Sequence, residues 1–212
     1  MQRKIARILE ILDSLYPWEG HCFLDYKAPW QLLFATILSA QCTDDRVNMV
    51  TPTLYKKFPN LESFVDADLS DIEAVIHSTG FYRAKARHLQ ESARKILGMF
   101  GGQLPSDLDS LTSLSGVGRK TANVVRGHIF GIPSIVVDTH VKRVTHRLGL
   151  TNHTDPTKIE FELMEILPST HWIRYNQQVI THGRQVCIAR NPRCGECQLK
   201  SECREHTNEH SK

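Results

Sequence analysis

A lysine placed directly after a glycine-rich turn is the residue of this sequence most suited to covalent chemistry. The stretch Leu114–Ala122 reads Leu-Ser-Gly-Val-Gly-Arg-Lys-Thr-Ala, in which Lys120 follows two glycines. Such glycines allow positive φ and carry no side chain, so backbone N–H groups can approach a phosphate closely. The positive end of a following helix disfavours the charge of a lysine in its first turn, and burial would act in the same direction. A partly neutral amine is a nucleophile, and this is the chemistry that we expect of Lys120.

The elements on either side of this turn must position the lysine. The segment 106–109 indicates a helix start, with Ser106 as N-cap and an acid three residues later. From residue 121 to 130 the apolar residues have a spacing suited to a packed helix. The sequence therefore predicts a helix, a tight Gly-x-Gly turn and a second helix. Asp138, further along, is predicted to cap another helix.

Four cysteines near the C-terminus have the density of a metal site. Of the six cysteines in the chain, four crowd into one short segment, namely Cys187, Cys194, Cys197 and Cys203. In a reducing compartment such crowding indicates a ligand set rather than a disulfide framework. Structural zinc sites often use two Cys-x-x-Cys hooks, whereas this segment has one hook and two wider spacings, and iron–sulfur clusters also take four thiolates. Spacing and chemistry alone leave zinc and an iron–sulfur cluster both open.

Composition sets broad limits on the function. A chain of 212 residues can bury a real core and form one large domain or two small lobes. The formal charge of +3 and the pI of about 8.5 permit a nucleic-acid partner without requiring one. No apolar run approaches the roughly 18 residues needed to span a bilayer, and the basic N-terminus leads into an amphipathic helix rather than a signal peptide. We expect a soluble cytoplasmic protein.

Helical spacing of apolar residues continues along most of the chain. Further helices are expected at 5–15, 29–38, 47–58, 69–77, 82–100, 108–114 and 141–148, and from about 156 and 172 onward, with a frayed polar end at 204–212. Strand alternation is absent, so the predicted fold is all-α. Thr79–Ala86 faintly repeats the stretch around Lys120, but Lys85 is one position out of register. We interpret this repeat as a second turn between helices, used differently.

Two motifs together resemble one known family. The lysine motif, followed by Val-Val-Asp-Thr-His-Val at 136–141, is similar to the helix-hairpin-helix DNA glycosylases of the endonuclease III type, over nearly the whole chain. One departure is Ser115, where the family usually has proline, but both glycines are kept and the hairpin is expected to survive. The resemblance implies a bifunctional DNA N-glycosylase and apurinic/apyrimidinic lyase of base excision repair that excises oxidised pyrimidines. Lys120 matches the family's Schiff-base lysine, and Asp138 matches its essential aspartate. Strand cleavage would follow by β-elimination.

The resemblance also implies an architecture and a cofactor. It implies a six-helix lobe at 22–132, with the helix-hairpin-helix motif at about 107–130. Residues 1–21 and 133–212 would form the second lobe, with a DNA cleft between the two. The x6-x2-x5 spacing of the cysteines at 187–203 is the spacing of this family, which implies a [4Fe–4S] cluster. We expect the cluster to be structural, because four protein ligands leave no open position.

Further residues are expected to contact DNA. Gln41 and Phe81 resemble the family's pair of residues that enter the duplex where the nucleotide leaves. The Gln41 amide could hydrogen-bond the orphaned base, and Phe81 would act as an apolar wedge, at a position where the relatives more often have leucine. The plainer interpretations of the two are a surface amide and a core aromatic. The other expected contacts are Gly116, Gly118, Arg119, Thr121, His140, Arg143, Arg190 and Arg193. The implied partner is double-stranded DNA with an oxidised pyrimidine or an abasic site, bound by a monomer.

Three other interpretations compete with this one. Monofunctional mismatch glycosylases of the same superfamily lack a lysine at the position of Lys120, and the adenine-removing ones have an additional C-terminal domain. A non-catalytic helix-hairpin-helix DNA-binding protein is disfavoured because Lys120, Asp138 and the four cysteines occur together. A zinc-stabilised DNA-binding protein would be recognised by its metal content.

Overall fold

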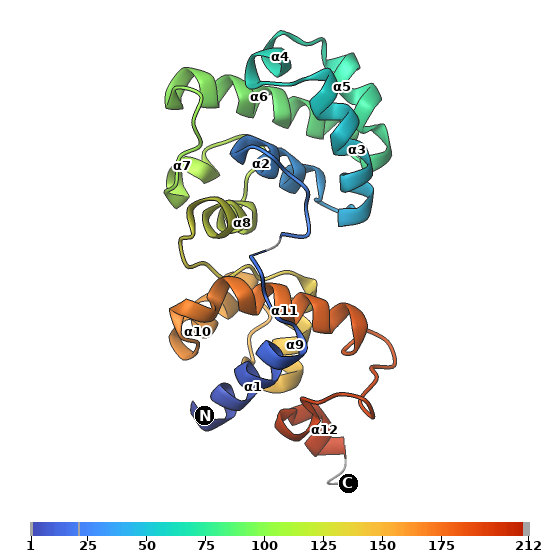
Figure 1. Cartoon of the computed structure of the whole chain (residues 1–212), viewed down its shortest axis with the longest axis vertical. Coiled ribbons are helices and arrows are strands. Elements are labelled where there is room, and N and C mark those ends of the chain that lie inside the picture. Colours follow the sequence, from blue (N-terminus) through green and yellow to red (C-terminus); the bar gives the residue numbers. More distant parts are fainter. Residues whose placement is uncertain (1, 21, 210–212) are drawn as a thin grey trace. The chain divides into compact units, whose positions relative to one another are not determined.

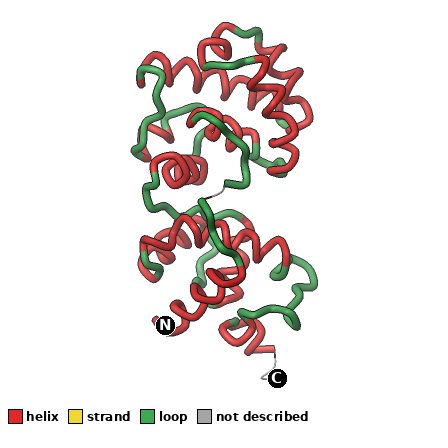
Figure 2. The backbone as a smooth tube through the Cα atoms, viewed as in Figure 1, coloured by secondary structure: helices red, strands yellow, loops and turns green. Residues whose placement is uncertain are grey.

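The computed structural model describes residues 2–20 and 22–209, with side chains up to residue 207. Within these ranges the chain consists of helices and loops without a strand, so the predicted all-α class is confirmed (Figures 1 and 2). The chain divides into two compact units. We call Cys22–Ile132 the central unit, and Met1–His21 together with Pro133–Lys212 the terminal unit. None of the described helices is long and apolar enough to cross a membrane.

The central unit is built by the helices from α2 to α8. Helix α6 packs against α4 and α5, and α2 packs against α3, α6 and α8. The bounds are α2 (Pro29–Leu38), α3 (Asp44–Lys57), α4 (Leu61–Asp66), α5 (Leu69–Ile76), the 3-10 helix η1 (His77–Thr79), α6 (Tyr82–Phe100), α7 (Leu108–Thr112) and α8 (Arg119–Phe130).

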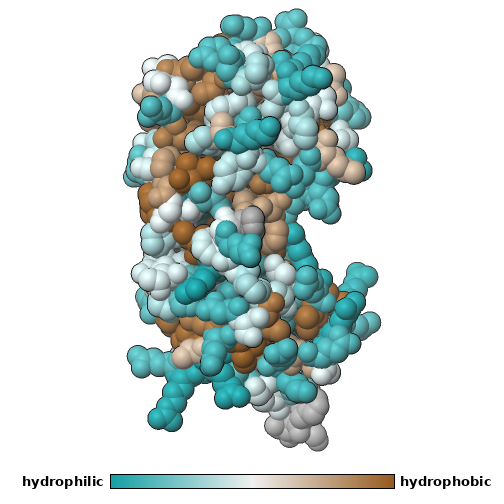
Figure 3. All heavy atoms as spheres, in the orientation of Figure 1, coloured by the Kyte–Doolittle hydropathy of each residue, from teal (hydrophilic) through white to brown (hydrophobic). Residues whose placement is uncertain are grey.

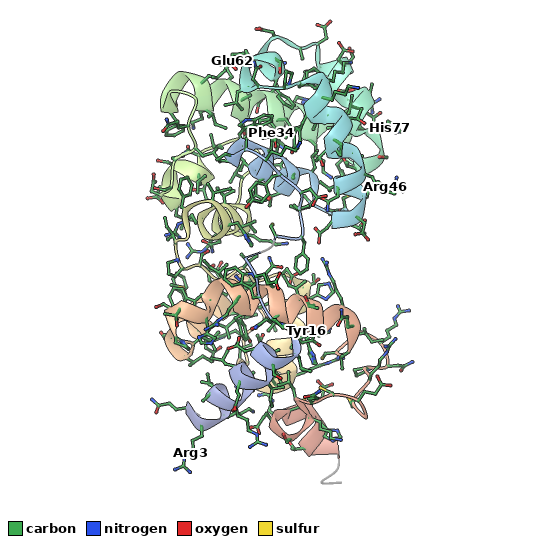
Figure 4. All side chains as sticks on the ribbon, viewed as in Figure 1. Arg3, Tyr16, Phe34, Arg46, Glu62 and His77 are labelled. Carbon is green, nitrogen blue, oxygen red and sulfur yellow. The ribbon has the colours of Figure 1, made fainter. Side chains whose placement is uncertain are left out.

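Helix α2 lies at the centre of this unit's core. Proline in its first turn suits a helix start, because the fixed φ is helical and no N–H is lost there. Phe34 is completely buried, and its ring meets Phe64 of α4 at 4.9 Å and Trp30 at 5.4 Å between ring centroids (Figure 4). Full burial of such a side chain contributes roughly 1.5–3 kcal/mol to folding. The core therefore holds α2 in place.

The terminal unit joins the first helix to the C-terminal third of the chain. Helix α1 buries Ile5, Ile8, Leu9 and Leu12 and packs against α11, which also packs against α9 (Figure 1). Hydrophilic atoms predominate on the face of the molecule shown in Figure 3, as expected when helices turn their apolar sides inward. The bounds are α1 (Gln2–Leu15), α9 (Thr139–Leu148), α10 (Pro156–Ile166), η2 (Ser169–His171), α11 (Trp172–Gln185), η3 (Lys200–Glu202) and α12 (Arg204–Glu209).

Some local expectations were wrong. The N-cap of α7 is Asp107 rather than Ser106, and its carboxylate accepts a hydrogen bond from the N–H of Ser110 at 2.8 Å. Both residue types make good caps, so the pattern was ambiguous by one position. The predicted frayed end contains helix α12, which packs against α9. The short helix α4 was not anticipated, because six residues are too few to show a helical period.

Candidate functional site

The predicted turn before Lys120 is present in the central unit, where residues 113–118 join α7 to α8. Gly116 has a φ of 74°, and a Cβ atom there would lie 2.7 Å from Cγ of His88 on α6. Glycine is therefore needed at this position both for its backbone and for the close approach of α6. Gly118 has a φ of −93° and open space around it. As the N-cap of α8, Gly118 leaves the first N–H groups of the helix without a side chain that would cover them.

Ser115, which stands where the similar family usually has proline, is fastened to α6. Its hydroxyl donates to Oε2 of Glu91 at 2.6 Å, and Nδ1 of His88 lies 2.9 Å from the same oxygen. Because a hydroxyl has one proton, Nδ1 of His88 must be the donor in that second bond. The carbonyl of Ser115 accepts from Oγ of Ser92 at 2.9 Å. The turn thus forms without proline, and hydrogen bonds to α6 take the place of the rigid ring.

Lys120 is the second residue of α8, and its side chain is exposed. The N–H of Ala122 donates to the carbonyl of Gly118 at 3.0 Å, so the backbone N–H groups before it lie in the first turn, where helices leave donors unsatisfied. Burial, one of the two influences expected to act on this amine, is absent because the side chain lies in solvent. The arrangement can bind an anion at the helix end and bring an amine to an electrophilic carbon.

Gln41 and Phe81 lie in two loops of the central unit, each in left-handed backbone conformation. The φ of Gln41 is 55° and that of Phe81 is 50°, a region that residues other than glycine seldom adopt. Both side chains are exposed, Phe81 to 66%. The interpretation of Phe81 as a core aromatic is therefore wrong. An apolar ring held in solvent by a strained backbone indicates a contact surface.

Asp138 is the N-cap of α9 in the terminal unit, as predicted. Its Oδ1 accepts a hydrogen bond from the N–H of Val141 at 2.8 Å, which fixes the direction of the carboxylate. His140 is half-buried next to it. Burial lowers the pKa of His140, while the charge of Asp138 opposes this shift. Lys120 and Asp138 belong to different compact units of the chain.

Arg143 makes several hydrogen bonds within the terminal unit. Its guanidinium donates to the carbonyl of Gly183 at 2.8 Å and to the carbonyl of Cys187 at 3.1 Å. Its Nη2 also lies 3.1 Å from Nδ1 of His140. Because arginine can only donate, Nδ1 is the acceptor and the proton of a neutral His140 is on Nε2. Arg143 therefore fixes the ring of His140 and ties α9 to the end of α11.

A methyl group at Gly183 is expected to destabilise the terminal unit by about 1–3 kcal/mol. The added Cβ would lie 3.0 Å from Nδ1 of His140 and 3.2 Å from Nη2 of Arg143, so this pair would have to move. Urea unfolding of the Gly183→Ala variant measures the effect. The control is Gly98→Ala, inside α6 with open space around it, which should be neutral or stabilising by about 0.5–1 kcal/mol. Wild-type stability of Gly183→Ala would contradict the expected crowding.

The four cysteines predicted as ligands lie in the terminal unit after α11. All are half-buried, and none forms a disulfide. Burial raises the pKa of the Cys197 thiol, and the charges of the other three cysteines raise it further. Among the described residues, no three His, Cys, Asp or Glu side chains converge tightly enough for one metal ion. A four-iron cluster does not require that convergence, because each thiolate binds its own iron, and the donor set fits such a cluster.

Arg147 of α9 holds the segment that carries the first cysteine. Its Nη1 donates to the carbonyl of Ile188 at 2.8 Å and lies 3.5 Å from Sγ of Cys187. Its Nε pairs with Oε2 of Glu205 on α12 at 3.2 Å. The carbonyl of the same arginine accepts from Sγ of Cys203 at 3.4 Å. One residue thus contacts both the first and the last cysteine of the set.

Arg147→Met is expected to make the protein lose iron to a chelator about 10- to 100-fold faster, because partners behind the ligands support metal binding to this extent. The variant removes the charge and the donors while keeping an unbranched side chain. Iron and sulfide content, followed over time after addition of the chelator, measures the effect. Lys142→Met, on the same helix and exposed, is the matched control and should retain the cluster. Equal rates for the two variants would contradict the assigned contact.

The two arginines between the first cysteines are surface residues. Arg190 and Arg193 are exposed, and Asn191 between them has a φ of 52°. Their side chains are available to a partner such as a phosphate backbone.

Each unit holds part of the predicted site. The central unit contains Gln41, Phe81, Gly116, Gly118, Arg119, Lys120 and Thr121, and the terminal unit contains Asp138, His140, Arg143, the two surface arginines and the four cysteines.

Two residues that support these groups were not predicted from the sequence. Arg147 is one, and its spacing of four from Arg143 was the available signal; His182 of α11 is the other. Nδ1 of His182 lies 3.0 Å from the hydroxyl of Tyr16, and Nε2 of His182 lies 3.6 Å from Sγ of Cys197. Burial lowers the pKa of His182 to about 4. No local pattern could have joined these three residues, because they are distant in the sequence.

Comparison with known families gives two matches that together cover most of the chain. Residues 34–169 match the HhH-GPD superfamily base excision DNA repair proteins. Residues 187–203, which contain the four cysteines, match the iron–sulfur binding domain of endonuclease III. The second match distinguishes between the two metal centres that spacing left open.

Individual relatives match over almost their full length. The chain is 51% identical to endonuclease III of Synechocystis sp., over 95% of this chain and 92% of that one. It is 36% identical to endonuclease III of Escherichia coli, over 93% of this chain and 95% of that one.

Solved structures agree with these relatives. A structure of endonuclease III trapped with DNA as a covalent intermediate has a TM-score of 0.93 and 39% identity, with 99% of each chain covered. A non-covalent endonuclease III–DNA complex has the same TM-score and identity, with 100% of this chain and 99% of that one covered. The chain therefore belongs to the HhH-GPD superfamily of base excision repair proteins and, within it, to the endonuclease III family of DNA glycosylases and apurinic/apyrimidinic lyases with a [4Fe–4S] cluster.

Proposed function

We propose that this enzyme acts as a monomer on oxidised pyrimidines in double-stranded DNA, and that Lys120 forms the covalent bond to the deoxyribose. The observation that carries the proposal is the position of Lys120, in the first turn of α8 and directly after the turn 113–118. The chain aligns over nearly the whole length of a relative that is trapped with DNA as a covalent intermediate, which supports a covalent step here.

The proposed reaction uses the amine of Lys120 twice, first as a nucleophile and then as part of an imine. The neutral amine attacks C1′, the C1′–N bond to the base breaks, and the base leaves with the electron pair and takes up a proton. The attached nitrogen loses a proton, and its lone pair then forms the imine with C1′ while the C1′–O4′ bond breaks; O4′ takes that bonding pair and a proton, so the sugar ring opens. The imine acidifies the C2′ hydrogen, and its removal expels the 3′ phosphate oxygen and cuts the strand. Water finally releases the lysine.

Asp138 is proposed to act on the charge that develops at the sugar. A carboxylate with a fixed direction stabilises a developing cation better than a mobile one, because it needs no reorganisation during the reaction. The hydrogen bond from the N–H of Val141 supplies that fixed direction. The second carboxylate oxygen is left to face the sugar or to accept a proton.

The remaining residues are proposed to bind and open the duplex. Gly116, Gly118, Arg119 and Thr121 would place the start of α8 on phosphates, and the target nucleotide must leave the stack because C1′ cannot be reached inside it. Phe81 would fill the gap, and Gln41 would hydrogen-bond the orphaned base. His140, Arg190 and Arg193 would contact the backbone. We assign to Arg143 the orientation of His140, since its guanidinium already donates to Gly183 and Cys187.

Borohydride trapping on a panel of duplexes tests this proposal. The holoenzyme is incubated with duplexes that contain thymine glycol, 5-hydroxycytosine, an abasic site or no damage, and iron and sulfide are measured on the same sample. The expected result is a covalent protein–DNA adduct with the first three, and strand cleavage without alkali. Cleavage that appears only after alkali, with no adduct, would overturn the lyase chemistry in favour of a monofunctional glycosylase.

A further inference from the structure

A buried lysine in the central unit has no part in the chemistry described above. Lys85 lies in the first turn of α6, only 4% of it is exposed, and burial lowers its pKa. Its Nζ donates to the carbonyl of Leu38 at 2.7 Å and to the carbonyl of Thr79 at 2.8 Å. A buried ammonium group is costly unless its surroundings compensate for it. The two carbonyl acceptors therefore explain how the ammonium group of Lys85 can be buried.

Both acceptors are the last residues of helices. Leu38 ends α2, and Thr79 ends η1. The final carbonyls of a helix lack intrahelical partners, and the negative helix end favours a cation. The ammonium group of Lys85 therefore supplies the missing hydrogen-bond donor to the ends of two helices, at Leu38 and Thr79, which are far apart in the sequence.

Each of these helix ends leads directly into one of the two strained loops. Leu38 precedes the loop with Gln41, and Thr79 precedes the loop with Phe81. Both loop residues have left-handed φ and exposed side chains. Such a backbone persists only when its surroundings hold it in place. The backbone N–H of Lys85 adds a third contact, since it donates to the carbonyl of Phe81 at 3.1 Å.

We propose that Lys85 is a positioning residue that fixes the loops of Gln41 and Phe81 relative to each other, so that both side chains enter the duplex together. This inference rests on the proposed roles of Gln41 and Phe81. Loss of the ammonium group leaves two buried carbonyls without a donor, and the two loops can then relax separately. Lys85 would therefore contribute to catalysis by holding Gln41 and Phe81 in the correct relative orientation before the duplex binds.

The test compares Lys85→Met with wild type on two substrates. Excision of thymine glycol from a duplex requires opening of the helix, whereas trapping on a single strand with an abasic site does not. We expect the variant to lose about 10- to 100-fold in kcat/KM on the duplex, the size of effect that a small misplacement causes. Trapping on the single strand should stay within about twofold of wild type, since the amine of Lys120 is untouched. Arg94→Met, an exposed cation on the same helix, is the matched control and should behave as wild type on both substrates.

A double-mutant cycle separates this inference from the roles on which it rests. If Lys85 acts through the loop of Phe81, Lys85→Met costs little more in the Phe81→Ala background. Additive losses would overturn the inference. Should Phe81→Ala and Gln41→Ala each leave duplex excision unchanged, the proposed roles of those two residues fail. Should they reduce excision while Lys85→Met does not, only the positioning role fails.

Folding of the variants is checked by thermal unfolding. If Lys85→Met does not fold, Lys85→Gln takes its place, since its amide can still donate to one carbonyl. The same difference between duplex and single strand is then expected. Equal losses on both substrates, or failure of both variants to fold, would show that Lys85 is a residue of the core and would overturn the positioning role.

Discussion

Lys120→Ala is expected to abolish the covalent adduct that borohydride traps on abasic duplex DNA. Strand cleavage should fall by roughly 10⁴- to 10⁶-fold, as happens when a nucleophile is removed from an enzyme that works through a covalent intermediate. The side chain is exposed, so thermal stability should stay near that of wild type. Gel analysis of the adduct and of the cleaved strand, together with thermal unfolding, measures these three quantities.

Lys120→Arg distinguishes a nucleophile from a phosphate contact. Arginine keeps the positive charge and can bind a phosphate, but it does not become neutral and cannot form the imine. If Lys120 is the nucleophile, the arginine variant binds DNA and is as inactive as the alanine variant. If Lys120 only contacts a phosphate, the arginine variant recovers much of the activity and the assignment fails. Lys56→Ala, at an exposed lysine of α3, controls for the loss of a surface charge.

Asp138→Asn is expected to slow base release by about 10²- to 10⁴-fold, the range of a positioned acid or base group. Binding to undamaged duplex should change little. Asparagine and aspartate are equally good N-caps, so the hydrogen bond to the N–H of Val141 can be kept. The fold of α9 should therefore survive while the negative charge is lost. Single-turnover excision, duplex binding and urea unfolding are the measurements.

Asp138→Ala completes the comparison, because it removes the charge and the cap together. It should lower stability by about 1 kcal/mol relative to Asp138→Asn, with the same loss of base release. If binding falls as far as base release in Asp138→Asn, Asp138 is architectural. If only the alanine variant is slow, the cap rather than the charge is what the reaction needs.

Much of the local structure follows from short stretches of sequence. The bounds of α6 and the N-cap of α9 were predicted because capping residues and apolar spacing act within one or two turns. The cap of α7 was misplaced by one residue, and α4 and α12 were missed. These helices are short, so packing against neighbours decides them more than their own periodicity does.

The sequence by itself determined the chemistry that the chain can carry. The turn before Lys120, the cap at Asp138 and the spacing of the four cysteines are read within a few residues, because turn geometry, capping and ligand density are local properties. Because these motifs resemble those of the endonuclease III family, the sequence also predicted the family to which the chain belongs.

Only the tertiary structure decided how these groups are supported. It placed α1 against α11, Arg147 beside Cys187, and the amine of Lys85 between the carbonyls of Leu38 and Thr79. Such contacts join residues that are distant along the chain. They depend on which apolar faces find each other on folding, and periodicity identifies an apolar face without identifying its partner.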